Sequence, residues 1–152
     1  MNEWTNLPRF PITDLNIRFL VHATEDVNKV LKAVYNMIPE RCPKLSFQKK
    51  RVKGEYGNPI LIYRTRINKK EILDSVLKRI GSMLSDHEKD RLREDIKSRI
   101  DGRSLYLRFD KQAACNGRAR FHSEDSIHIR IRFRTRNLAE IKNVCENVGI
   151  LI

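Results

Sequence analysis

The residues most able to do chemistry lie in one row near the C-terminal end, between residues 126 and 136. Apolar side chains stand at every second position, and the alternate positions hold His128, Arg130, Arg132, Arg134 and Arg136. Alternate side chains of a β-strand point to opposite faces, so the segment predicts a strand with one apolar and one cationic face. Such a row of cations is either neutralised by neighbouring strands or presented to an anionic ligand. A solvated outer face is the structural alternative.

The positive charge is concentrated in the segments that have strand patterns. The chain of 152 residues has a net charge of +12, and residues 41–70 carry ten basic side chains but only one acidic side chain. Residues 71–100, which have a helical pattern, carry seven of each sign. This distribution predicts a basic surface made by a sheet and its loops. Such a surface attracts polyanions, with RNA or DNA first and an anionic membrane second.

Other strand segments supply further cations and one tyrosine. The additional candidate RNA contacts from predicted strands are Lys49, Arg51 and Lys53 in residues 45–53, Arg64 and Arg66 in residues 60–67, and Tyr106 and Arg108 in residues 104–109. The alternation leaves open which face of the first two of these strands is covered by helices. A lysine-rich edge strand also hinders edge-to-edge aggregation, which is a structural explanation of the first group.

These side chains would be positioned by a sheet and a layer of helices. Strand patterns cover residues 14–21, 45–53, 60–67, 104–109 and 126–136, with a short extended segment at 118–121. Helical spacing follows Thr24, a predicted N-cap, and recurs over 69–84, 85–101 and 138–148, with a helical turn in 110–117. The order β-α-β-β-α-α-β-(β)-β-α predicts one α+β domain, residues 1–152. Its mixed, largely antiparallel sheet would have helices on one face.

A polar loop at residues 110–120 offers a second group of contacts. Lys111, Arg118 and Arg120 have the charge to grip phosphates, and the Gln112 amide can read a base or a 2′-hydroxyl. The structural alternative is that Asp110 caps the turn and pairs with Lys111 or a nearby arginine. Both interpretations stay open at this point.

The turn at residues 54–59 contains two glycines and a tyrosine. Tyr56 can stack on a base from a hairpin tip, or it can cover an edge of the core while the glycines supply backbone freedom. The sequence favours the second interpretation.

No motif predicts catalysis, a metal or a cofactor. His22 precedes a helix start without a visible nucleophile, which favours a structural role, and no phosphate-binding glycine loop or carboxylate cluster is evident. Cys42, Cys115 and Cys145 are far apart and form no CxxC pair, so we expect small buried thiols rather than a zinc site. The sequence therefore predicts a protein that is not an enzyme.

Three segments carry a resemblance to a known family. They are residues 21–26 (VHATED), residues 54–60 (GEYGNPI), and residues 108–114 (RFDKQAA) followed by Gly117. The chain resembles, over about residues 12–136, the archaeal RNA-binding family described as predicted exosome subunits. The resemblance implies a fold like that of ribosomal protein L-five, RNA binding, and a link to RNA processing or degradation. Relatives tend to have tyrosine where this chain has Cys115, which puts a stacking role there in doubt.

Together these observations predict a non-catalytic RNA-binding protein that uses a basic sheet face and adjacent loops. The alternative is a protein-interaction module that docks on an RNA-processing or ribosomal assembly, with exosome or ribosomal proteins as partners, and the mixed-charge helix of residues 86–100 is its candidate interface. A homodimer is a further predicted state. Without a signal pattern or a long apolar run, we expect a cytoplasmic protein with no membrane partner.

Overall fold

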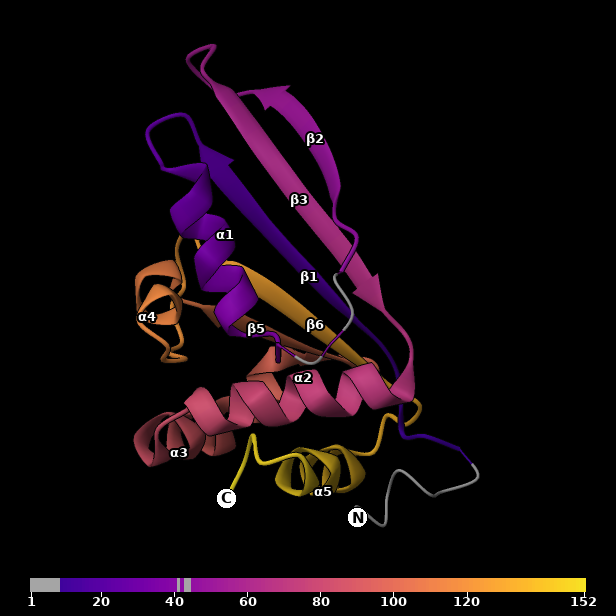
Figure 1. Ribbon diagram of the computed structural model, residues 1–152. Helices are drawn as coiled ribbons and strands as arrows, with labels where there is room; N and C mark the ends of the chain where they lie inside the picture. The colour runs from indigo at the N-terminus through magenta and orange to yellow at the C-terminus, as the bar shows by residue number, and fades with distance from the viewer. Residues whose placement is uncertain (1–8, 41, 43–44) are drawn as a thin grey trace.

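A computed structural model describes residues 9–40, 42 and 45–152 (Figure 1). It contains a six-stranded antiparallel sheet with the strand order β2-β3-β1-β6-β5-β4. The strands are β1 (Ile12–His22), β2 (Gln48–Lys53), β3 (Pro59–Ile67), β4 (Ile100–Asp101), β5 (Ser104–Phe109) and β6 (Ile127–Phe133). The N-terminal residues 1–8, on which the absence of a signal pattern rests, lie outside the described residues.

The helices lie on one face of this sheet, as Figure 1 shows for α1 and α2 in front of the strands. They are α1 (Val27–Asn36), α2 (Lys70–Met83), α3 (Asp86–Asp95), the 3₁₀ helix η2 (Ile96–Arg99), α4 (Lys111–Cys115) and α5 (Leu138–Asn147). This arrangement confirms the predicted α+β class with helices on one side.

The core forms between the helices and the apolar sets of alternating strand residues. Ile17, Ile129 and Leu107 are aligned on the neighbouring strands β1, β6 and β5 and are at most 1% exposed. Leu77 of α2 is fully buried in the same cluster. Burying one such aliphatic side chain contributes about 1.5–3 kcal/mol, so the apolar alternation fixes which face of each strand points inward.

Several predicted boundaries were wrong in detail. Asp26, rather than Thr24, caps α1, because the Asp26 side chain accepts a hydrogen bond from the Asn28 N–H. The predicted helix over 85–101 ends as a 3₁₀ turn, and Ile100–Asp101 pairs with β5. The strand predicted over 126–136 ends at Phe133 because the chain then turns into α5, which Asn137 caps.

The C-terminal tail packs directly on α2. A Cβ atom built on Gly81 would lie 2.7 Å from the carbonyl oxygen of Gly149. Gly149 itself has a φ of +86°, and the following Ile150 and Leu151 are buried. The close approach requires a glycine on the helix and lets the tail cover the core.

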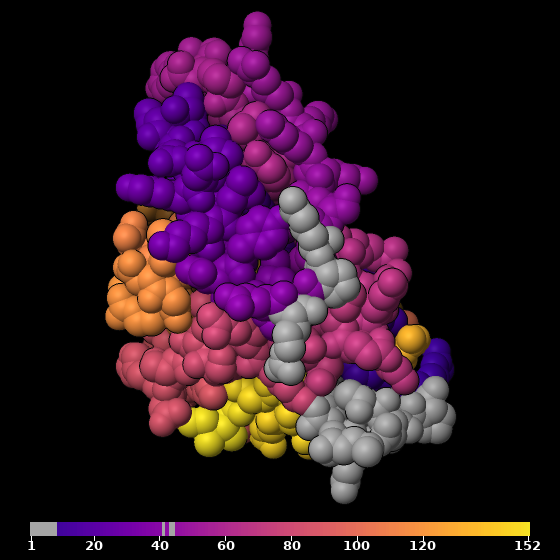
Figure 2. Space-filling view, viewed as in Figure 1, coloured from indigo at the N-terminus to yellow at the C-terminus, as the bar shows by residue number. Residues whose placement is uncertain are grey.

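The hairpin of β2 and β3 projects beyond the helices, at the top of Figures 1 and 2. Tyr56 at its tip is 88% exposed, so the interpretation in which it covers an edge of the core was wrong. The turn does use glycine freedom, because Gly57 has a φ of +81°. This hairpin, the hairpin arm, therefore exposes side chains on both faces, as the mostly exposed β2 shows.

Candidate nucleic-acid interface

Strand register arranges the residues of the uncovered sheet face in lines across the strands. The first line runs from Arg64 in β3 through Arg18 in β1 and His128 in β6 to Arg108 in β5. The second contains Arg66, Asn16, Arg130 and Tyr106 on the same four strands, and the third pairs Asp14 with Arg132 and Arg132 with Ser104. One face therefore gathers cations from four strands that are far apart in sequence.

The first two lines surround a shallow depression of about 340 Å³. Its polar lining comprises Asn16, Arg18, Arg64, Tyr106, Arg108, His128 and Arg130. A neighbouring hollow of about 520 Å³ shares Tyr106 and Arg108 with it and continues toward η2 and the loop at His122. Tyr106 is 43% exposed between the two. The face thus combines guanidinium groups with one accessible aromatic ring.

Asp14 neutralises part of the third line. Its carboxylate is 1% exposed, and it accepts hydrogen bonds from Arg132 Nη2 at 2.7 Å and Arg66 Nη2 at 3.0 Å. Burial raises the pKa of this carboxyl, but the bonds and charges of the two arginines outweigh burial and bring the pKa below its ordinary value. Arg132 and Arg66 therefore share one counter-charge.

The guanidinium groups of Arg18, Arg64 and Arg130 around the depression differ from this pair. Within the part of the chain that the structure describes, no carboxylate lies within ion-pair distance of Arg18, Arg64 or Arg130. The Nε atom of Arg130 is buried, and no partner among the described residues accepts a hydrogen bond from it. Uncompensated charge of one sign on a concave surface attracts anions.

His128 lies between two of these cations. Burial lowers the pKa of its imidazole, and the charges of Arg18 and Arg108 on the flanking strands lower it further, against a smaller opposing effect of Asp125. Both effects favour the neutral imidazole over the protonated one in the free protein.

The other strand candidates are distributed over both faces. Arg64 and Arg66 share the open face with Arg130, whereas Lys49, Arg51 and Lys53 point to the opposite face, in register with Tyr63, Leu61 and Pro59. The ammonium of Lys49 lies 6.0 Å from the Tyr63 ring centroid. Arg134 and Arg136 follow the end of β6, and Arg134 Nε donates to the Phe10 carbonyl at 2.6 Å. These last residues lie outside the lines described above.

Two of the four candidate contacts in the loop at residues 110–120, Lys111 and Arg120, make structural contacts within the chain instead. Asp110 caps α4 through the Ala113 N–H and pairs with Arg120 at 3.1 Å. Lys111 is 11% exposed, and its Nζ donates to the Leu20 carbonyl at 2.7 Å. The remaining candidates, Gln112 and Arg118, are exposed but do not line the depression.

The Lys111 ammonium also lies among three side chains that could act as metal ligands. His22, Glu25 and Asp125 bring their ligand atoms within 4.8 Å of one another. The Lys111 ammonium lies 3.0 Å from Glu25 and 2.9 Å from Asp125, and His22 Nε2 is 3.1 Å from Asp125. Asp125 adopts a φ of +25°, and these contacts hold it there. A cation of the chain itself thus satisfies both carboxylates, which supports a structural role for His22.

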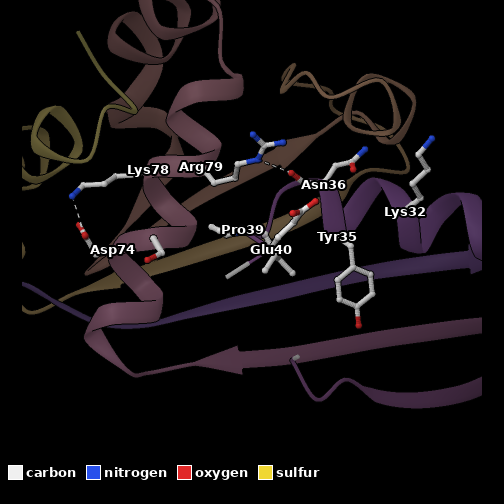
Figure 3. A pocket seen from close by; sticks show the side chains of 10 residues that line it. Lys32, Tyr35, Asn36, Pro39, Glu40, Asp74, Lys78 and Arg79 are labelled. Atoms are coloured by element: carbon white, nitrogen blue, oxygen red, sulfur yellow. Dashed lines mark hydrogen bonds and ion pairs between the residues drawn. The ribbon is translucent and has the colours of Figure 1, made fainter. Parts of the chain in front are cut away.

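A larger hollow of about 890 Å³ lies on the helix side, between α1 and α2 (Figure 3). Asp74, Lys78 and Arg79 make contacts with other residues of its lining. Lys78 pairs with Asp74 at 2.9 Å, and Arg79 Nε donates to the Asn36 carbonyl at 2.9 Å, as the dashed lines in Figure 3 show. This hollow therefore lacks the excess of cations that the open face has.

The sequence analysis named His128 only as a member of the row at residues 126–136, and it named neither Arg18 nor Asn16 as a candidate contact. All three line the depression. The signal was present, because the alternation in residues 14–21 already separated Asn16 and Arg18 from the apolar set. What the sequence could not supply is the register that aligns Arg18 with His128.

An antiparallel sheet with helices on one face and an uncovered, arginine-lined second face defines a class of α+β proteins suited to binding polyanions. The comparisons with known proteins specify that class. Residues 14–133 match the model of a family described as "RNA binding", and the chain belongs to this family. It is 34% identical to the RNA-binding protein PAB1135 of Pyrococcus abyssi over 140 residues, which cover 88% of this chain and 91% of that protein.

Solved structures show the same fold. Protein AF2318 from Archaeglobus fulgidus, described as a DUF54 protein, superposes with a TM-score of 0.74 at 26% identity, covering 90% of this chain and 99% of that one. Mth689, a DUF54 protein from Methanothermobacter thermautotrophicus, gives a TM-score of 0.71 at 28% identity and covers 93% and 99% of the two chains. The architecture is therefore shared along nearly the whole length.

No helix of the described residues has the length and apolar character needed to cross a membrane. The family description and the name of the Pyrococcus relative refer to RNA binding rather than to an enzymatic activity.

Proposed function

We propose that this chain binds the sugar–phosphate backbone of RNA on the open sheet face, without catalysis. The observation that carries the proposal is the depression on this face, where Arg18, Arg64 and Arg130 have no acidic partner among the described residues. Guanidinium groups match phosphate oxygens in geometry and charge, so an RNA backbone supplies the missing partners. Family membership supports RNA over other polyanions.

Contacts to phosphates would supply most of the affinity, and Tyr106 would add one stacking platform. A base stacked on an aromatic ring contributes about 1–3 kcal/mol. Because Tyr106 is the one Phe, Tyr or Trp among the described residues that line the depression, the surface favours recognition of backbone and shape over reading of a sequence. Tyr56, at the exposed hairpin tip, can add a second stack outside the depression.

The test is direct binding measured across a salt series. Fluorescence anisotropy with single-stranded, duplex and hairpin RNA would give the slope of log affinity against log salt concentration. Four phosphate contacts, from Arg18, Arg64, Arg108 and Arg130, predict a slope of about −3 to −4. A flat salt response, or no binding at low salt, would overturn the proposal.

We also propose a role in RNA processing or degradation as an exosome-associated protein, on the basis of the family resemblance. Affinity purification with and without ribonuclease treatment tests it. Recovery of exosome or ribosomal proteins only before ribonuclease treatment supports an RNA-mediated link, and recovery after the treatment supports direct docking. A cytoplasmic location and a homodimer stay predictions, which microscopy of the tagged protein and light scattering would measure.

The alternative of docking through the mixed-charge helix has less support from the contacts of α3. Glu88 is 8% exposed, pairs with Arg91, and accepts a hydrogen bond from the Phe121 N–H. Arg93 pairs with Glu146 of α5. Several charges of this helix thus hold the helix to its own chain.

A further inference from the structure

We propose that the depression holds an RNA phosphate directly over His128, and that binding of this phosphate places a proton on the imidazole. RNA affinity would then rise as the pH falls. The inference rests on the proposed RNA-binding function and specifies one subsite within it, together with its regulation by pH.

The geometry places His128 at the centre of a cationic line. Its register partners are Arg18 in β1 and Arg108 in β5, and all three side chains line the same depression. Arg130 lies two residues further along β6 on the same face, and Arg64 lies beyond Arg18. An anion seated between the flanking guanidinium groups therefore lies next to the imidazole as well.

The opposing negative charge is already engaged. Asp125 precedes β6 and is the acid that acts on His128, but its carboxylate contacts the Lys111 ammonium at 2.9 Å and His22 Nε2 at 3.1 Å. In the free protein, His128 thus lies beside two arginines that pair with no carboxylate of the described residues, and near a carboxylate that already contacts Lys111 and His22. A bound phosphate changes this balance, because it neutralises the arginines and accepts a hydrogen bond from the imidazolium.

The direction of the coupling follows from these charges. Without RNA the pKa of His128 lies below its ordinary value, because burial and the charges of Arg18 and Arg108 favour the neutral ring. A phosphate favours the protonated ring and raises the pKa in the complex. Affinity then increases as the pH falls through the pKa of the complex and levels off below the pKa of the free protein. The gain is about tenfold for each pKa unit that the phosphate adds.

The experiment measures RNA affinity by anisotropy from about pH 5 to pH 8, the range in which histidine titrates, at constant ionic strength. The probe is an oligouridylate, whose bases do not titrate there. We expect the wild-type affinity to rise toward low pH and the His128→Asn variant to show a pH-independent affinity. His87→Asn, which alters an exposed histidine of α3, is the matched control and should keep the wild-type profile.

A second measurement reports on the imidazole itself. Long-range ¹H–¹⁵N NMR of the histidine rings should show that the pKa of His128 rises when the oligouridylate is added, and that inorganic phosphate alone shifts it in the same direction. RNA binding that is independent of pH, or an unchanged pKa of His128 in the complex, would overturn the inference but not the proposed function. A complete lack of RNA binding would overturn both.

Discussion

The faces of the sheet can be compared by two variants that remove the same charge. Arg18, Arg64 and Arg130 lie on the open face and line the depression, whereas Lys49, Arg51 and Lys53 lie on the other face of the hairpin arm. Changing either group to glutamine removes three positive charges from the net +12. The two variants therefore have equal net charge and differ in which face has lost its cations.

The expected losses differ because the open-face arginines would contact phosphates. Each phosphate contact contributes about 0.7–0.9 to the slope of log affinity against log salt, so the open-face variant should lose about 2–2.7 from that slope. If the variant and the wild type bind equally at 1 M salt, this loss of slope corresponds to roughly 100- to 500-fold weaker binding of the variant at 0.1 M. The charges on the other face act only through screened solvent, over a Debye length of about 10 Å at 0.1 M, and their removal should cost a few-fold.

The assay is anisotropy of a labelled RNA hairpin at four salt concentrations, with thermal unfolding of each variant as the control for folding. Arg18, Arg64 and Arg130 form no ion pair among the described residues, so their replacement should leave the unfolding temperature nearly unchanged. Equal losses in both variants would show that net charge alone drives binding. A larger loss in the Lys49, Arg51 and Lys53 variant would place the interface on the arm.

Four further outcomes follow from single contacts. Gly81→Ala should lower the free energy of unfolding by about 1–3 kcal/mol in denaturant titrations, because the added Cβ meets the Gly149 carbonyl. Asp14→Asn should cost about 1–3 kcal/mol of stability but tighten RNA binding, because two arginines lose their counter-charge. Folding lowers the pKa of the Asp14 carboxyl, so the wild-type protein loses this stabilisation as the pH falls below about 3.8. The variant should show no such loss, which acid titration followed by circular dichroism would measure. Lys111→Met should destabilise the fold and leave the salt slope of RNA binding unchanged, since the ammonium holds Glu25 and Asp125 together. Tyr106→Leu should also keep the salt slope but weaken binding of single-stranded RNA by roughly 5- to 150-fold, the loss of one stack.

The sequence predicts the elements of the fold well because their apolar periodicity is strong. The stripe of α2 and the alternation of β1, β5 and β6 correspond closely to the buried residues of the structure. Boundaries failed where local geometry decides between neighbouring residues. Asp26 and Thr24 are both good N-caps by type, and only the backbone path of the turn selects Asp26.

The candidate site was predictable in part. Alternation identified the cationic side of β6 and of β5, but it could not decide between the two faces of β2 and β3, because β2 has cations on both faces and β3 has apolar side chains on both faces. Strand register decides which side chains lie on the open face. Arg66 is in register with Asn16, and Lys50 rather than Lys49 is in register with Ile62. Long-range contacts such as that of Lys111 with Glu25 have no signature in a single sequence.

The central strand β1 sets how strongly each line of the open face attracts an anion. It contributes Asp14 to the third line, neutral Asn16 to the second and Arg18 to the first, so the neutralisation of the arginines decreases steadily along the face. A polyanion is therefore drawn toward the line of Arg18 and His128 rather than spread evenly over the sheet. The segments that carry the family resemblance meet next to this end of β1, where His22 pairs with Ile60 and Lys111 fixes Glu25. Their contacts thus join β1 to β3 and the start of α1 to α4, beside the line of Arg18 and His128.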